Sequence, residues 1–278
     1  MILKLSMNYY KLTIIINAFL LLGISNNALS QQSSKYKLLE VPKNNQIEID
    51  QYGYFYIIDQ DNLIKYDNEG HTLYHYSNKL LGNIDQIDIS NPLRPLLFYK
   101  DQGLIIVLDN TLSQQKEPMS LNELGLYQTS CIANSNFDNG IWLYDIDVNE
   151  IIKINNLSQV NYRSGNLSVL IPNMKFPILN LKEKNRKLYV VTRNKIFVMD
   201  QFGSLLSVIN LSAEKGLIIK EKNIITYDGN AICQFDILDF KIDTLLKTKE
   251  YFKIMKLENN IVAVSKNRSR INYVNLNQ

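Results

Sequence analysis

Residues 53–76 have the sequence GYFYIIDQDNLIKYDNEGHTLYHY, in which short apolar runs alternate with turns. The runs are rich in Tyr, Ile and Phe and are too short for helices, so they are typical of β-strands. The Asn-Glu-Gly turn that follows Asp67 joins the last two runs as a hairpin. Together with residues 47–50 in front, the stretch predicts a unit of four antiparallel strands, named a to d in chain order.

The same pattern recurs along the rest of the chain. In each repeat, strand c ends on Asp or Asn, and these end residues follow one another at intervals of roughly 36 to 46 residues. A short acidic or amide side chain at this place can accept hydrogen bonds from the backbone of the c–d turn, so we predict turn residues rather than metal ligands. The six positions are Asp67, Asp109, Asn155, Asp200, Asp236 and Asn275.

This period is that of a β-propeller blade. We predict an all-β fold in which residues 31–278 form one propeller of six four-stranded blades; seven blades are the alternative, because residues 121–175 are poorly patterned. The last repeat lacks an outer strand, and residues 36–41 alternate like a strand. We therefore expect the N-terminal strand to close the ring as strand d of the last blade, which removes an open sheet edge.

Residues 1–30 have the pattern of a secretory signal peptide. Lys4 and Lys11 flank the start, residues 12–24 are apolar, and small residues at Ala28 and Ser30 precede a cleavage point before Gln31. The alternative is a membrane anchor, but about 13 apolar residues fall short of the roughly 20 that cross a bilayer. We expect an exported, periplasmic protein that associates with the outer membrane through a partner and has no membrane span of its own.

The composition limits the function. The chain has 278 residues, 46% hydrophobic and 21% charged, which is typical of a folded domain. Its net charge of +3 is too small to indicate a nucleic-acid partner. Cys131 and Cys233 lie in apolar strands of separate repeats, so we expect unpaired core thiols, with a disulfide as the alternative.

Motifs for catalysis or cofactors are lacking: the sequence contains no GxGxxG, P-loop, HExxH, CxxC or GxSxG. His71 and His75 are separated by a turn and a strand, so we expect exposed side chains and no metal site. The acidic run Asp50, Asp59, Asp61 and Asp67 lacks calcium-loop spacing and is predicted to be a solvated turn surface. We expect no cofactor and no metal.

Two segments contain residues that a simple turn between strands does not require, and both are a–b connections of neighbouring repeats. Residues 89–99 carry two prolines and an arginine, and residues 138–142 contain the only Trp. Arg and Trp are favoured in protein interfaces, so we predict a partner-binding surface. The alternative is that the aromatic residues pack between blades while the prolines stiffen the loop. The candidate binding residues are Pro92, Arg94, Pro95, Asn139 and Trp142.

Residues 54–59 and 64–70 resemble the repeats of six-bladed bacterial propellers of the NHL and YWTD type. Residues 89–113 and 138–142 are similar to exported propellers of Gram-negative bacteria that use type IX secretion, a group that includes the periplasmic plug of the outer-membrane translocon. The resemblance implies a non-enzymatic interaction module, monomeric within a complex, whose partner is a protein such as the translocon barrel. No catalytic residue follows from it. The alternative is a propeller hydrolase or glycan-binding protein with acids in the central channel.

Overall fold

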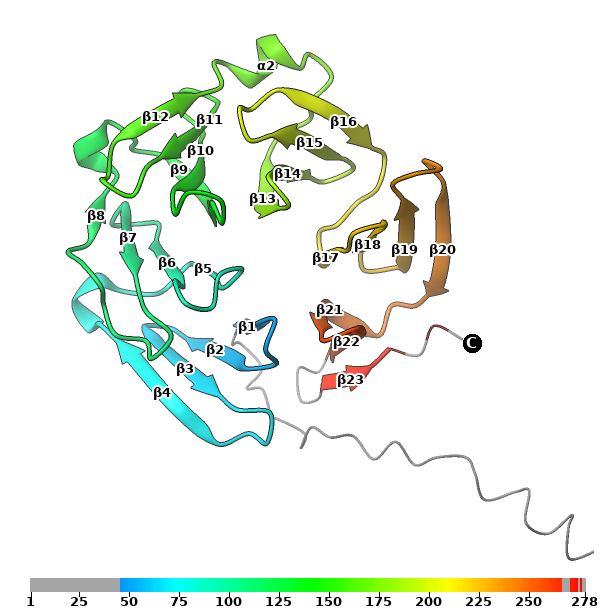
Figure 1. Cartoon of the computed structure of the whole chain (residues 1–278), viewed down its shortest axis with the longest axis horizontal. Helices are drawn as coiled ribbons and strands as arrows, with labels where there is room; N and C mark the ends of the chain where they lie inside the picture. Colours follow the sequence, from blue (N-terminus) through cyan, green and yellow to red (C-terminus); the bar gives the residue numbers. More distant parts are fainter. Residues whose placement is uncertain (1–45, 267–270, 275, 277–278) are drawn as a thin grey trace, which may run out of the picture. The chain divides into compact units, whose positions relative to one another are not determined.

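Six antiparallel sheets are arranged in a ring around a central opening (Figure 1). The computed structural model describes residues 46–266, 271–274 and 276, all of which belong to one compact unit spanning residues 36–278. Within these described residues, five sheets have four strands and one has three. The predicted six-bladed propeller is confirmed, and the seven-bladed alternative is wrong.

Each sheet is built from strands that follow one another in the chain. The strands of blades 1 to 3 are β1 (Gln46–Ile49), β2 (Phe55–Asp59), β3 (Asn62–Tyr66), β4 (Thr72–Ser77), β5 (Gln86–Asp88), β6 (Leu96–Tyr99), β7 (Leu104–Val107), β8 (Met119–Ser120), β9 (Thr129–Asn134), β10 (Ile141–Asp145), β11 (Glu150–Ile154) and β12 (Val160–Arg163). Those of blades 4 to 6 are β13 (Ile178–Lys184), β14 (Lys187–Thr192), β15 (Ile196–Asp200), β16 (Leu205–Ile209), β17 (Gly216–Ile219), β18 (Asn223–Tyr227), β19 (Ala231–Asp236), β20 (Ile242–Lys247), β21 (Tyr251–Leu257), β22 (Asn260–Ser265) and β23 (Ile271–Tyr273).

Helical structure is confined to short connections in the described part of the chain. These are η1 (Lys79–Leu81), η2 (Asn122–Leu124) and α2 (Leu167–Leu170). No helix among the described residues is long and apolar enough to cross a bilayer. The predicted signal peptide, residues 1–30, lies outside the described residues and stays a prediction.

The c–d turns follow the predicted chemistry. The Asp200 carboxylate accepts hydrogen bonds from the backbone N–H of Phe202 and Ser204, both at 2.8 Å. Asp67, Asp109 and Asn155 accept from the same two relative positions, and Asp236 accepts from the second and third residues after it. The turn role is therefore confirmed at five positions, while Asn275 lies outside the described residues.

The apolar core is divided among the six interfaces between blades. Each cluster combines residues of two neighbouring sheets, and together they close the circuit from blade 1 round to blade 6. At the join of blades 6 and 1, Ile47 and Phe55 pack against Met255 and Val262. Among the described residues blade 6 has three strands, one fewer than the other blades. The closing strand predicted at residues 36–41 lies outside the described residues and stays a prediction.

Both cysteines are free thiols in different blades. Cys131 is buried in the core between blades 3 and 4, as expected. Cys233 on β19 is only half-buried, because its side chain faces Thr244 on the outer strand of the same blade.

These environments predict unequal reactivity of the two thiols. Burial raises the pKa of Cys131 to about 12, so this thiol stays protonated and is shielded from reagents. Iodoacetamide at mildly alkaline pH is expected to alkylate Cys233 in the native protein and both cysteines in urea. Peptide mass spectrometry measures this, and native alkylation of Cys131 at the same rate as Cys233 would contradict the placement.

Candidate functional site

The a–b loops of blades 1 to 3, residues 50–54, 89–95 and 135–140, emerge on one face of the ring. They do so because consecutive antiparallel strands turn at alternate ends of each blade. We call these three loops the docking face. Their tips expose the residues Tyr52, Leu93 and Phe137, which are 61%, 64% and 50% accessible. Large apolar side chains presented by several neighbouring loops are typical of surfaces that contact another protein.

A buried carboxylate fixes the first of these loops. Asp50 is 2% exposed and accepts hydrogen bonds from the N–H groups of Tyr52 (2.9 Å) and Tyr54 (3.0 Å) and from the Tyr56 hydroxyl (3.1 Å). The prediction that Asp50 belongs to a solvated surface is therefore wrong. Its oxygens are used to hold the loop, which presents Tyr52 in a defined place.

The second and third loops are joined to each other. Arg94 Nη1 donates to Asn134 Oδ1 at 2.5 Å, and Asn134 Nδ2 donates to the Arg94 carbonyl at 3.2 Å. Asp88 accepts the N–H of Asn134 at 3.0 Å, and Asn136 donates to the hydroxyl of Ser90 at 3.2 Å. The structure thus brings the two predicted segments side by side and makes them one rigid surface.

Arg94 is half-buried within this junction. Burial lowers the pKa of its guanidinium, and the nearby carboxylates of Asp88 and Asp138 oppose that change. The pKa of Lys116 is lowered, first by burial of its ammonium and then by electrostatic repulsion from the nearby Arg94. Arg94 of the docking face thus lies near a second basic group, Lys116 of the β7–β8 connection, and near the acidic Asp138 of the third loop.

The predicted binding residues fall into two groups. Pro92, Pro95 and Trp142 are buried, so their side chains are not part of the surface that a partner would contact. Trp142 has no exposed area; its Nε1 donates to Glu183 Oε2 at 2.6 Å, and its ring meets that of Tyr162 edge-on at 5.7 Å. Trp142 therefore packs between blades, which was the alternative to the predicted binding role. Arg94 is half-buried, and Asn139 is exposed at the tip of the third loop.

The residues that form the surface itself were not predicted from the sequence. Tyr52, Leu93 and Phe137 had no motif to mark them. Arg186, in the β13–β14 turn of the next blade, lies over the Phe137 ring at 4.3 Å and adds a cation at the edge of the docking face. The alternation of apolar and turn residues in the a–b connections was the only available signal.

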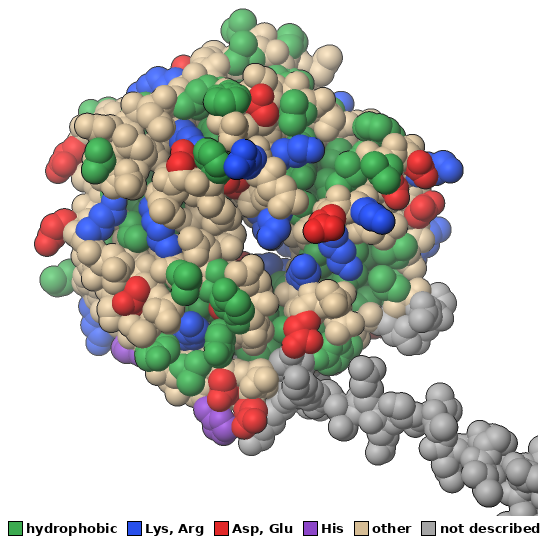
Figure 2. Space-filling model, in the orientation of Figure 1, with side chains coloured by type: hydrophobic (Ala, Val, Ile, Leu, Met, Phe, Trp, Pro, Cys, Tyr) green, Lys and Arg blue, Asp and Glu red, His purple; other side chains and the backbone are tan. Residues whose placement is uncertain are grey.

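A second feature is the central channel, which holds a cavity of about 680 Å³ lined by β1, β5, β13, β17 and β21. Figure 2 shows both basic and acidic side chains around this opening. Six acidic residues line the cavity: Glu48, Asp50, Asp88, Glu183, Glu214 and Glu258. Glu48 forms an ion pair with Lys253, and Asp88 accepts the N–H groups of Ser90 and Asn134. Both carboxylates are therefore held by contacts within the protein.

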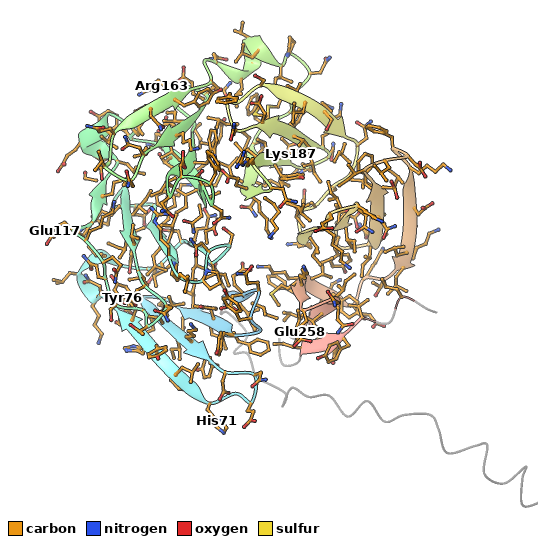
Figure 3. The ribbon with its side chains drawn as sticks, viewed as in Figure 1. His71, Tyr76, Glu117, Arg163, Lys187 and Glu258 are labelled. Atoms are coloured by element: carbon orange, nitrogen blue, oxygen red, sulfur yellow. The ribbon has the colours of Figure 1, made fainter. Side chains whose placement is uncertain are left out.

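The histidines lie apart from both features. Figure 3 shows His71 at the outer rim of the ring, where its Nδ1 lies 3.0 Å from Asp67. His75 is exposed and contacts Asn62 at 3.2 Å. In the part of the chain that the structure describes, no three His, Cys, Asp or Glu side chains are grouped so as to hold a metal ion.

Solved structures with the same arrangement come from proteins of very different activity. Virginiamycin B lyase from Staphylococcus aureus, solved with quinupristin, is 14% identical, with a TM-score of 0.58 over 85% of this chain and 82% of that one. The Pan2 WD40 domain of Neurospora crassa is 9% identical, with a TM-score of 0.57 over 86% and 75%. A chain of the mitotic checkpoint complex is 10% identical, with a TM-score of 0.57 over 82% and 75%.

These similarities define the chain as a β-propeller and establish the fold alone. No family model and no curated protein sequence matches the chain.

Proposed function

We propose that this protein is a non-enzymatic interaction module that binds a partner protein through the docking face. The observation that carries the proposal is the set of exposed apolar tips, Tyr52, Leu93 and Phe137, on loops that hydrogen bonds already fix. Binding to a fixed surface loses little conformational entropy, which favours affinity. The propeller fold is one that serves in protein complexes, as in the mitotic checkpoint complex.

The chemistry of the docking face indicates the kind of partner. Arg94, Lys116 and Arg186 accompany its apolar tips. The matching surface therefore carries apolar side chains with acidic residues around them, since complementary charge steers association. The resemblance to exported type IX propellers supports a periplasmic partner, and we propose an outer-membrane translocon barrel. In that place a rigid ring would obstruct the pore as a plug or serve as an accessory subunit.

The test is affinity capture from solubilised outer membranes with a double variant, Leu93→Asp together with Phe137→Asp. Both side chains are exposed, so the fold is expected to persist while an apolar contact becomes a charged one. Wild type is expected to retain a barrel protein that the variant loses, with the bound amount falling about tenfold or more.

Leu80→Asp is the matched control. Leu80 is 93% exposed in η1, in a d–a connection on the opposite face, and its replacement is expected to leave capture unchanged. Loss of the partner in both variants, or in neither, would refute the docking face. A dimer in size-exclusion chromatography that the double variant dissociates would show that a second copy, not a barrel, occupies the surface.

The alternative function, a hydrolase or glycan-binding protein, depends on acids in the channel. Six acidic residues line the cavity, and contacts within the protein support a structural role for five of them. Glu48 pairs with Lys253, Asp88 and Asp50 accept backbone N–H groups, Glu183 accepts the indole of Trp142, and Glu214 pairs with Arg193. We therefore favour the interaction module.

A further inference from the structure

The central channel contains a group of lysines among its acidic residues. Five lysines line its cavity from three of the six blades: Lys182, Lys184, Lys215, Lys253 and Lys256. Lys182 and Lys184 are two positions apart on β13, so both side chains project from the face of the strand that lines the channel. Glu183 between them points the other way, to Trp142 in the core.

Six acidic residues line the same cavity: Glu48, Asp50, Asp88, Glu183, Glu214 and Glu258. Five of them make contacts within the protein, Glu183 by accepting the indole N–H of Trp142. Glu48 is paired with Lys253, and Asp88 accepts two backbone N–H groups. Asp50 holds the first docking loop, and Glu214 pairs with Arg193 outside the cavity lining at 3.3 Å. Among residues 46–266, four of the five channel lysines form no ion pair, Lys253 being the exception.

Lys182 is the channel lysine that is half-buried and yet forms no ion pair among the described residues. The one hydrogen bond of its ammonium goes to the Leu217 carbonyl of the next blade at 3.3 Å. Burial lowers its pKa, the carboxylates of Glu48 and Asp88 oppose that change, and Lys253 and Lys184 add to the lowering. An ammonium has three donors, so this one retains capacity for an acceptor in the cavity.

We propose that the channel binds a small multivalent oxyanion, with Lys182 as its principal contact and Lys184 as a second. An anion would offset the repulsion among the channel lysines and accept their remaining hydrogen bonds. A cavity of about 680 Å³ has the size of a small-molecule site. The bases of two docking loops border the cavity at Asp50, Gln51, Ile89 and Ser90, but the exposed tips Leu93 and Phe137 do not line it. Anion binding in the channel goes beyond the proposed interaction function.

The test is isothermal titration calorimetry of the purified protein with citrate and with triphosphate, at low ionic strength. At least one is expected to bind saturably with one molecule per chain, and the preferred probe identifies a carboxylate or a phosphate ligand. Lys182→Gln is expected to weaken binding about tenfold or more, because it removes a partly desolvated charge. Added sodium chloride is expected to weaken binding to wild type as well.

Lys247→Gln is the matched control, because Lys247 is exposed on the outer strand β20 and carries the same charge. Lys247→Gln is expected to leave anion binding unchanged. Lys184→Gln is expected to weaken anion binding without changing the fold. The proposal is overturned if neither anion binds saturably, or if Lys247→Gln weakens binding as much as Lys182→Gln. The Leu93→Asp, Phe137→Asp variant is expected to bind the anion normally, so failure of either proposal leaves the other standing.

Discussion

Replacing Trp142 with alanine is expected to lower the free energy of unfolding by about 3–5 kcal/mol. The side chain is fully buried and belongs to the apolar cluster that joins blades 3 and 4. Its removal opens a cavity there and takes from Glu183 the indole N–H that it accepts at 2.6 Å. A buried carboxylate that loses its donor adds to the penalty. Urea denaturation followed by circular dichroism measures the change.

Two further variants separate the causes. Trp142→Phe keeps most of the packing but removes the indole N–H, so an intermediate loss of stability is expected. Phe137→Ala removes an aromatic ring that is half exposed on the docking face, and it is expected to cost less than about 1 kcal/mol. If Trp142→Ala were no more destabilising than Phe137→Ala, Trp142 would not be the core residue that its burial indicates.

The contrast between these two aromatics explains why the sequence predicted the fold better than the site. The fold signal is local: a strand, a turn residue such as Asp200, and another strand, repeated at the period of a blade. In the five repeats whose turns the structure describes, the turn hydrogen bonds all lie within four residues of the Asp or Asn, so the pattern can be recognised in the sequence without knowledge of the ring. The blade count and the four strands of the first blade followed from that pattern.

The burial of Trp142 could not be deduced in the same way. All five residues of β10 are buried, because a strand in the middle of a blade is covered by the neighbouring blade on each face. Such a strand lacks the alternation that would separate inward from outward residues. A rare Trp beside a loop therefore suggested a binding residue, while the exposed Phe137 five positions earlier attracted no attention.

The channel lysines were missed for a related reason. Lys182 and Lys253 are far apart in sequence, and each lies on an inner strand that mixes polar and apolar residues without any recognisable binding motif. Only closure of the ring brings their strands to a shared cavity. The sequence period predicts that a central channel exists. It does not predict which charged side chains face one another across that channel.

Gly203→Ala is the second change with a large expected effect, because two separate penalties coincide at this position. Gly203 has φ +78° in the c–d turn of blade 4, a left-handed conformation that costs a residue with a Cβ about 1–2 kcal/mol. An added Cβ would also overlap the hydroxyl and ring of Tyr162 on β12 of blade 3. That ring packs against Trp142 and cannot move freely, so overpacking is expected to add about 1–3 kcal/mol.

Gly125→Ala isolates the first penalty, since Gly125 has φ +73° and an added Cβ there meets nothing within 4 Å. The difference in unfolding free energy between the two glycine variants then measures the overlap with Tyr162. In a Tyr162→Ala background the overlap is absent, and Gly203→Ala is expected to cost no more than Gly125→Ala. Equal costs of the two glycine substitutions in the wild-type background would mean that blades 3 and 4 do not meet at this turn. The core in which Trp142 is buried would then require a different packing of the two sheets.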